Sequence, residues 1–235
     1  GVGYPLSENQ LVNFGLNYSH EDLSTVFSSS SQLRDWVRNN GDSYFRRIGS
    51  DPVLGTVLDT LELSASWLYD SRNRYLFPTS GASHRLTFTI TPPGGSVEYA
   101  TATWRSQQYF RFAGVPLLEK VPLLLTTNLG WGTAFGDTTA LPPHRHFFSG
   151  GSDSVRGFRD GTLGPRDSLG NPYGGDASIS AQFDAIIPLP AKFSSSARLS
   201  LFVDAGQSFY LGDTVFRNKR GDRVEYPFDL SELRV

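Results

Sequence analysis

Apolar and polar residues alternate with a period of two along most of this chain, and this pattern limits the folds it can adopt. Between residues 11 and 20, for example, Val12, Phe14, Leu16 and Tyr18 alternate with small or polar residues. A period of two places successive side chains on opposite faces of a β-strand. The same pattern occurs in seven segments, at residues 11–20, 57–69, 84–91, 97–112, 121–131, 174–187 and 197–205. The sequence therefore predicts an all-β protein with antiparallel strands.

Charged and aromatic side chains favour one kind of two-faced sheet over another. The polar faces carry Glu62, Arg85, Arg105, Asp184, Arg198 and Asp204. Such charges suit the wet lumen of a barrel, whereas Arg or Lys facing lipid near the bilayer midplane costs roughly 2–4 kcal/mol. Aromatic residues near strand ends or on the apolar faces suit interfacial girdles: Trp67, Trp104, Trp131, Tyr18, Tyr69 and Tyr109. The predicted fold class is an antiparallel transmembrane β-barrel, and a soluble β-sandwich with one solvated face per sheet is the alternative.

The connections between the predicted strands differ in length at the two ends of the sheet. Alternation stops between residues 21 and 52, where residues 31–41 predict a short helix capped by Ser30 or Ser31 and ended by Gly41. Such a long insertion is unusual in a compact sandwich. Long loops on one side and tight turns on the other are typical of outer-membrane barrels.

Composition excludes several other classes of protein. No apolar run approaches the roughly 20 residues of a membrane-spanning helix. The mean hydropathy of −0.28 is compatible with strands in which only every second residue is apolar. A net charge of −2, with scattered basic residues, argues against a nucleic-acid partner.

The sequence shows no catalytic or metal-binding pattern. It contains no cysteine, which removes disulfides and thiolate metal sites. His144 and His146 flank Arg145 without a nearby cluster of acidic residues, so we expect surface residues and neither a metal nor a cofactor. No Gly-x-Ser-x-Gly nucleophile motif occurs. We therefore expect a protein that is not an enzyme.

Residues 147–158 hold one arginine, Arg156, among glycines and aromatic residues between two predicted strands. Gly150 and Gly151 allow backbone conformations that are closed to residues with a Cβ atom. We expect three aromatic side chains to anchor the segment, Phe147, Phe148 and Phe158. The segment predicts an inserted loop, at about residues 137–173, that positions a charge.

The order of motifs resembles one protein family. The sequence Val155-Arg156-Gly157-Phe158 stands behind Gly150-Gly151 and is followed by Thr162-Leu163-Gly164-Pro165. This arrangement resembles the inward-folded extracellular loop of BamA-family outer-membrane assembly barrels. The segment from Asp70 to Gly81, which ends Phe-Pro-Thr-Ser-Gly, resembles a short periplasmic turn of the same family. The resemblance extends over essentially the whole chain.

This resemblance implies a fold and a set of site residues. Residues 1–235 would form part of a barrel of roughly sixteen strands, with the inserted loop folded inward. Asp184 and Asp204 match the two wall acids that hold the loop arginine in the family, the second within Phe202-Val203-Asp204-Ala205-Gly206. The family commonly has glutamate at the first position, and Asp184 is one methylene shorter. We therefore expect the firmer contact at Asp204.

The resemblance also implies a function, a location and partners. The function is insertion and folding of β-barrel proteins into the bacterial outer membrane. Partners would be the outer-membrane lipid bilayer, unfolded outer-membrane protein clients and accessory assembly lipoproteins that dock on parts outside this chain. A two-partner secretion pore that exports one protein substrate is the alternative, and a passive porin, for which Arg156 would be dispensable, is a further one. With no initiating methionine and with residues 1–5 and 231–235 resembling pieces of strands, we expect an internal fragment of a barrel domain.

Overall fold

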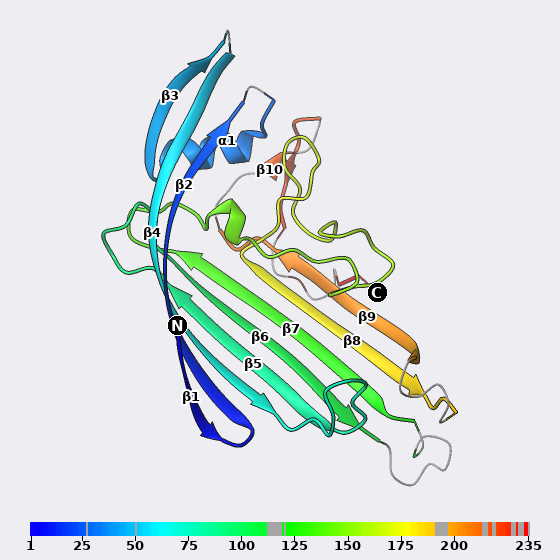
Figure 1. Ribbon diagram of the computed structural model, residues 1–235. Coiled ribbons are helices and arrows are strands. Elements are labelled where there is room, and N and C mark those ends of the chain that lie inside the picture. The colour runs from blue at the N-terminus through cyan, green and yellow to red at the C-terminus, as the bar shows by residue number, and fades with distance from the viewer. Residues whose placement is uncertain are drawn as a thin grey trace.

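Antiparallel strands account for most of the regular structure in the computed structural model, with an α-helix and a long loop on one side of the sheet (Figure 1). The structure describes residues 1–26, 28–49, 51–111, 119, 121–190, 197–212, 216–217, 220–226, 229 and 233–234. The strands are β1 (Val2–Ser7), β2 (Gln10–Thr25), β3 (Asp42–Ile48), β4 (Asp51–Asp70), β5 (Gly81–Ile90), β6 (Tyr99–Phe110), β7 (Leu123–Ala134), β8 (Ala177–Ile187), β9 (Leu199–Phe209), β10 (Phe216–Arg217) and β11 (Arg223–Val224). The helices are α1 (Ser31–Asn39) and a short 3-10 helix, η1 (Pro143–Arg145).

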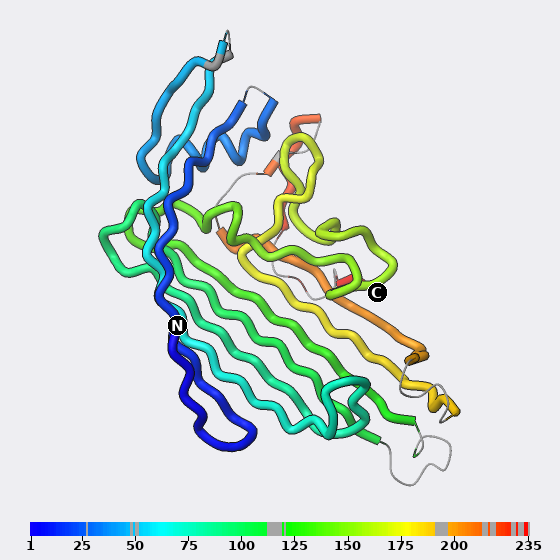
Figure 2. Tube along the Cα trace, viewed as in Figure 1, coloured from blue at the N-terminus to red at the C-terminus, as the bar shows by residue number. Residues whose placement is uncertain are grey.

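The main sheet has nine strands in the order β1-β2-β4-β5-β6-β7-β8-β9, with β3 paired to β4 outside this path. All neighbouring strands run antiparallel. The long strand β4 pairs with β2 along one edge, and its other edge pairs first with β3 and then with β5. The Cα trace shows β3 and the start of β4 projecting as a hairpin beyond the rest of the sheet (Figure 2).

Burial in the main sheet is inverted relative to a water-soluble protein. Large apolar side chains on the outer face are exposed, including Phe14, Leu16, Leu63, Leu86, Phe88, Leu129, Leu201 and Val203. Polar and charged side chains on the inner face are buried, including Glu62, Thr126, Ser180, Gln182, Asp184 and Asp204. Exposed apolar surface of this extent is unfavourable in water but not in lipid. The prediction of part of an antiparallel transmembrane β-barrel is confirmed, with β1 and β9 at the two edges of an open sheet. The sandwich alternative is wrong because the long strands form one sheet rather than two packed sheets.

Aromatic rings gather on the outer face near the short-turn end of the sheet. Trp67 lies 6.2 Å from Tyr69 and 6.3 Å from Trp104 between ring centroids. His84 stacks between Tyr69 and Trp104, at 5.7 and 5.4 Å. Amphipathic rings at this level suit the membrane interface. Tyr109, which we grouped with them, is an odd-numbered residue of β6 and shares the inner face with Arg105, opposite to the face of Trp104.

Helix α1 lies where the sequence predicts it. The Ser30 hydroxyl accepts a hydrogen bond from the Leu33 backbone N–H at 3.4 Å and caps its first turn. The helix ends at Asn39, and Gly41 adopts a φ of +67°, which favours glycine. No helix among the described residues is both long and apolar enough to cross a membrane.

The long interruption predicted between residues 21 and 52 is only partly correct. β2 continues to Thr25, β4 begins at Asp51, and the strand β3 was missed. The sequence of β3 lacks a clean alternation because its hairpin with β4 projects beyond the sheet, and Phe45 there is 78% exposed. A strand without one buried face need not alternate.

Several predicted boundaries lie outside the described residues. These are Phe112 at the end of one strand, residues 116–118 and 120 of the following turn, and residues 231, 232 and 235 of the last strand piece. Arg234 is described and forms an antiparallel bridge with Gly206 of β9. Its carbonyl oxygen accepts a hydrogen bond from the Gly206 N–H at 3.0 Å.

Candidate functional site

The connection between β7 and β8 contains the inserted loop (residues 137–173), which lies over the inner face of the sheet (Figure 1). Backbone pairing holds it together and joins it to the segment just before β8. Phe147 pairs with Gly175, and Ser149 pairs with Leu163 inside the loop. The Leu163 carbonyl oxygen in turn accepts a hydrogen bond from the Ser208 hydroxyl of β9 at 2.8 Å. The loop is therefore a folded part of the protein rather than a loose connection.

A tight turn presents the arginine motif to the sheet. Gly150 and Gly151 have φ values of +105° and +101°, which are unfavourable for other residues. The Gly151 N–H donates to the Val155 carbonyl oxygen at 3.1 Å, and the Gly150 N–H donates to the Ser154 hydroxyl at 2.8 Å. The two glycines thereby reverse the chain just before Arg156.

Val155 anchors this turn in the wall of the sheet. Its relative exposure is 0%. A Cβ atom added at Gly206 of β9 would lie 2.9 Å from Val155 Cγ2, so the absence of a side chain at Gly206 makes room for the valine. Gly157, on the other side of the arginine, has a φ of +90° and open space around its Cα atom. This position therefore favours glycine because of its backbone conformation and not because of crowding.

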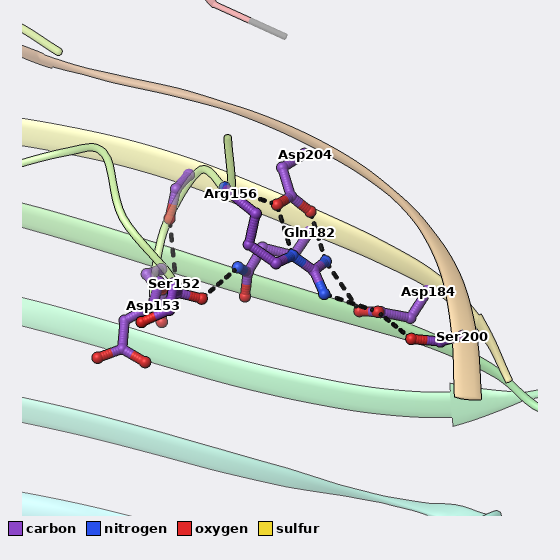
Figure 3. Close-up of polar contacts among 9 residues, drawn as sticks. Ser152, Asp153, Arg156, Gln182, Asp184, Ser200 and Asp204 are labelled. Carbon is purple, nitrogen blue, oxygen red and sulfur yellow. Dashed lines mark hydrogen bonds and ion pairs between the residues drawn. The ribbon is translucent and has the colours of Figure 1, made fainter. Parts of the chain in front are cut away.

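The Arg156 side chain lies between Asp204 of β9 and Asp184 of β8 (Figure 3). Its backbone N–H and its Nε donate to Asp204 Oδ2 at 2.8 and 2.7 Å, and Nη2 donates to Asp204 Oδ1 at 2.6 Å. Nη1 donates to Asp184 Oδ1 at 2.9 Å, and Nη2 donates to Asp184 Oδ2 at 3.3 Å. Each carboxylate is thus held by two guanidinium donors, which is the strong arrangement for such a pair.

Low exposure strengthens this ion pair. The side chains of Asp204, Asp184 and Arg156 are 2%, 9% and 25% exposed, so water screens them weakly. Hydrogen bonds to Asp204, and then to Asp184, raise the pKa of Arg156 above its ordinary value. The guanidinium stays charged at any physiological pH, and the group of three carries a net charge of −1.

Neighbouring polar groups position the acids and the turn. The Ser200 hydroxyl donates to Asp184 Oδ1 at 3.0 Å, and the Phe202 ring lies under the guanidinium with its centroid 3.8 Å from Arg156 Cζ. Gln182 Nε2 donates to the Ser152 carbonyl oxygen at 3.2 Å, and Asn128 Nδ2 approaches the Asp153 carbonyl oxygen at 3.4 Å. The inner wall therefore supports both the charge and the backbone of the turn.

The aromatic anchors expected from the sequence are only partly correct. Phe147 is half-buried and lies over Gly130 of β7, where an added Cβ atom would meet its ring at 2.5 Å. Phe148 and Phe158 are 48% and 36% exposed. The buried anchor of the motif is instead Val155, because the turn brings this small side chain, and not the rings, against β9.

A second loop arginine, which the sequence reasoning missed, contacts the opposite part of the wall. Arg145 Nη2 donates to Glu62 Oε1 of β4, and the hydroxyl of the fully buried Tyr99 donates to the same oxygen. Asn17 Nδ2 donates to Glu62 Oε2 at 3.3 Å. Glu62 was predicted only as a polar-face residue. The alternating pattern of its strand predicted that Glu62 faces the lumen. No neighbouring residue in the sequence identified its partner Arg145, which lies 83 positions away.

His146 is a buried residue, so the prediction that it lies on the surface is wrong. Its side chain is 0% exposed, with Nδ1 2.9 Å from the Tyr173 carbonyl oxygen and Nε2 3.1 Å from the Leu141 carbonyl oxygen. Burial lowers the pKa of His146. The ring fixes two distant parts of the inserted loop to each other. Among the described residues there is no group of three or more His, Asp or Glu side chains that could hold a metal ion.

Helix α1 contacts both ends of the inserted loop. Trp36 Nε1 donates to the Ala140 carbonyl oxygen at 2.9 Å, and Asn40 Oδ1 accepts from the Thr139 N–H at 2.8 Å. At the other end, the Ser168 N–H donates to Gln32 Oε1 at 3.0 Å. Apolar side chains from α1, β4, the start of β6 with the segment before it, and the loop form the core beneath these contacts: Trp36, Val37, Leu54, Leu58, Val97, Tyr99 and Leu141.

Comparison with known proteins finds relatives over most of the chain. Residues 1–230 match the Omp85 superfamily domain. The outer membrane protein assembly factor BamA of Neisseria meningitidis serogroup B is 31% identical over 233 residues, which are 95% of this chain and 28% of that protein. A SAM50-like protein of Schizosaccharomyces pombe is 27% identical over 208 residues, which are 86% of this chain and 42% of that protein.

A solved structure shows the same fold. The crystal structure of BamA from Haemophilus ducreyi lacking POTRA domains 1–3 superposes with a TM-score of 0.76 at 25% sequence identity, over 88% of this chain and 40% of that chain. The chain thus spans less than half the length of each of these relatives. The inverted sheet, the inward-folded loop and the match over residues 1–230 agree, and the chain belongs to the Omp85 superfamily.

Proposed function

We propose that this chain is the loop-bearing part of a barrel that inserts and folds β-barrel proteins into the bacterial outer membrane. The observation that carries the proposal is the ion pair of Arg156 with Asp204 and Asp184, which holds the inserted loop against the inner wall. It occurs in a chain that is similar to an assembly factor of a bacterial outer membrane and to a SAM50-like protein. The proposal extends to residues 1–235 as a partial barrel domain with the inserted loop at residues 137–173.

The inserted loop determines what such a barrel can do. Because it lies over the inner face and is tied to β4, β8 and β9, it occupies space that a passive pore would leave for water. A loop held in this way shapes the lumen and braces the wall while a client protein folds at the barrel. We propose no catalytic step, and binding and positioning would suffice.

The proposed partners follow from the two faces of the sheet. The exposed apolar face would contact the outer-membrane lipid bilayer. Unfolded outer-membrane proteins would be the clients, and accessory lipoproteins would dock on parts of the protein outside this chain. No observation on the described residues favours a two-partner secretion pore.

The test is the substitution of Arg156 by alanine in the intact protein. We expect the rate at which a client barrel folds into lipid vesicles to fall by roughly tenfold or more, because two buried carboxylates lose their counter-charge. Arg159→Ala is the matched control, since Arg159 is exposed on the same loop. A wild-type folding rate for Arg156→Ala, with the variant protein itself correctly folded, would overturn the proposal.

A further inference from the structure

Two arginines lie directly opposite each other on the inner wall, away from the arginine motif. Arg85 of β5 pairs with Arg105 of β6 in the antiparallel register, and both side chains are exposed. In the part of the chain that the structure describes, neither side chain takes part in a hydrogen bond or an ion pair. Like charges placed directly opposite each other destabilise a sheet. The pair is therefore unexplained by the stability of the fold.

The acids of the surrounding wall are already bound to other cations. Asp184 and Asp204 hold Arg156, and Glu62 holds Arg145. Nearer to the arginine pair, Asp70 Oδ2 accepts from Arg72 Nη2 at 2.6 Å. Among the described residues, Arg85 and Arg105 therefore leave two uncompensated positive charges at one level of the inner wall.

These charges face a hollow in the wall. A cavity of about 490 Å³ is lined by Arg85, Arg105 and the neighbouring polar residues Ser83 and Gln107, which also face each other across β5 and β6. The ion pair of Asp70 with Arg72 lines it as well. Tyr75 and Leu68 add apolar surface to its edge. The hollow thus offers the guanidinium groups of Arg85 and Arg105 beside the Asp70–Arg72 ion pair, together with hydroxyl and amide groups and a small apolar margin.

The chemistry and the location of the hollow point to its occupant. Guanidinium groups bind carboxylates in a planar, bidentate manner. Lipid head groups are excluded because Arg85 and Arg105 lie on the face opposite to the lipid-facing Leu86 and Trp104. The groups lining the hollow would also suit the peptide backbone and an occasional apolar side chain.

We propose that Arg85 and Arg105 bind carboxylate groups of an extended, acidic polypeptide segment in the lumen. The inference rests on the proposed function and deepens it, since it assigns a chemical class of client segment to one part of the wall. The site is separate from the arginine motif, and Arg156 makes no contribution to it. One acid of this chain could compete: the Asp153 carboxylate points away from the Arg156 guanidinium, and its backbone carbonyl contacts Asn128, which neighbours Arg105 on β7 (Figure 3).

The experiment measures binding of two extended peptides to the intact protein in detergent. One peptide alternates Asp and Glu with small residues, and the other has Asn and Gln in their place. We expect the acidic peptide to bind on the order of tenfold more tightly than the amide peptide at low salt, with the difference shrinking at high salt. In the variant Arg85→Gln/Arg105→Gln, the two peptides should bind equally.

A control variant and a stability measurement make the result specific. Arg46→Gln/Arg47→Gln removes the same charge from the exposed strand β3 and should keep the preference for the acidic peptide. Thermal unfolding of Arg85→Gln/Arg105→Gln should occur at the same or a higher temperature than in the wild type, because a repulsion is removed. A marked loss of stability would show a structural role and overturn the proposal.

Three other outcomes would also overturn it. Equal binding of both peptides to the wild type would show that no carboxylate is recognised. Displacement of the acidic peptide by an equal concentration of inorganic phosphate would indicate a site for small anions. Binding of the acidic peptide only to Asp153→Asn would identify the loop carboxylate as the natural partner. Because peptide binding requires no folding of a client protein, a failure here is distinguishable from a failure of the proposed function.

Discussion

Asp204 accepts three hydrogen bonds from Arg156, including one from its backbone N–H, whereas Asp184 accepts two. Asp204 is also the less exposed of the two side chains. Asp184, although shorter than a glutamate, nevertheless reaches the guanidinium. The Arg156 side chain extends from Asp204 on β9 towards β8, and the Ser200 hydroxyl orients the Asp184 carboxylate. The two acids are therefore unequal partners of one cation.

This asymmetry predicts unequal effects of neutralising the two acids. Asp204→Asn should destabilise the folded barrel by about 3–5 kcal/mol, the range for breaking a buried ion pair, and Asp184→Asn should cost less. Samples are heated at a series of temperatures before gel electrophoresis, on which folded and unfolded barrels migrate differently. The temperature at which the folded band disappears measures the difference between the two variants. Equal temperatures for the two variants would contradict the ranking.

Asp176, just before β8, predicts a dependence of stability on pH. Burial raises its pKa to about 6, above the ordinary value of 3.8, while Oδ2 accepts from the N–H groups of Leu211 and Gly212. The folded protein binds the Asp176 proton more tightly than the unfolded chain does. The stability contributed by protonated Asp176 is therefore complete below about pH 3.8 and is lost as pH rises through about 6.

The variant Asp176→Asn should lack this dependence. Between about pH 4.5 and about pH 7.5, which lie on the two sides of the folded-state pKa, the wild type should lose about 2 kcal/mol of stability relative to the variant. Burial lowers the pKa of His146, so the contribution of His146 to the stability of the protein changes in the opposite direction and is lost as pH falls. His146 Nε2 lies 4.0 Å from Asp176 Oδ1, so the difference between wild type and variant also contains the coupling of these two groups. A difference that is constant with pH would contradict the prediction.

At the level of single residues, the sequence itself singled out Arg156 in a glycine-rich loop, but the pairing of Arg156 with Asp184 and Asp204 came only from a family resemblance. The alternation of β8 and β9 places Asp184 and Asp204 on the polar face, but it cannot tell which charge meets which. For the same reason the contact of Arg145 with Glu62 was missed: the partners are far apart in sequence and Arg145 belongs to no motif. Burial of Val155 depends on the space left at Gly206, which appears only in three dimensions.

Among the elements, α1 has a role that its sequence did not reveal. Its amphipathic pattern predicted a helix, and the structure shows that the helix joins the two ends of the inserted loop through Asn40 and Gln32. The strands were predicted well where one face is polar and one apolar. The prediction failed at β3, where side chains on both faces of the strand are exposed and no alternation is required.

The position of α1 predicts the effect of one substitution. Asn40→Ala removes hydrogen bonds to the N–H and the hydroxyl of Thr139 and to the Trp36 carbonyl oxygen. Backbone amides at residues 137–141 should then exchange with deuterium about tenfold faster or more, because each lost hydrogen bond of a buried group costs roughly 1–3 kcal/mol. Asp35→Ala, on the exposed side of the same helix, should leave the exchange unchanged.

For the molecule as a whole, the outer and inner faces of the sheet should respond in opposite ways to a new charge. Leu63→Arg places a guanidinium on the lipid-facing side of β4, at a cost of about 2–4 kcal/mol if the position is near the midplane. Ser64→Arg, one residue further, points into the lumen on the same face as Glu62 and should cost much less. Folding yield into lipid vesicles compares the two variants, and equal yields would contradict the assignment of the faces.

The inserted loop is tied to the wall at Glu62 of β4 and again at Asp204 of β9, strands that stand far apart in the order of the sheet. Flattening the sheet would increase the straight-line distance between these two strands. The loop would then have to open its turn at residues 151–155 or release one of the two arginines. Curvature of this wall is therefore coupled to the ion pairs of the loop. Flattening the wall would strain the ion pairs, and loss of an ion pair would make the wall mechanically less stiff.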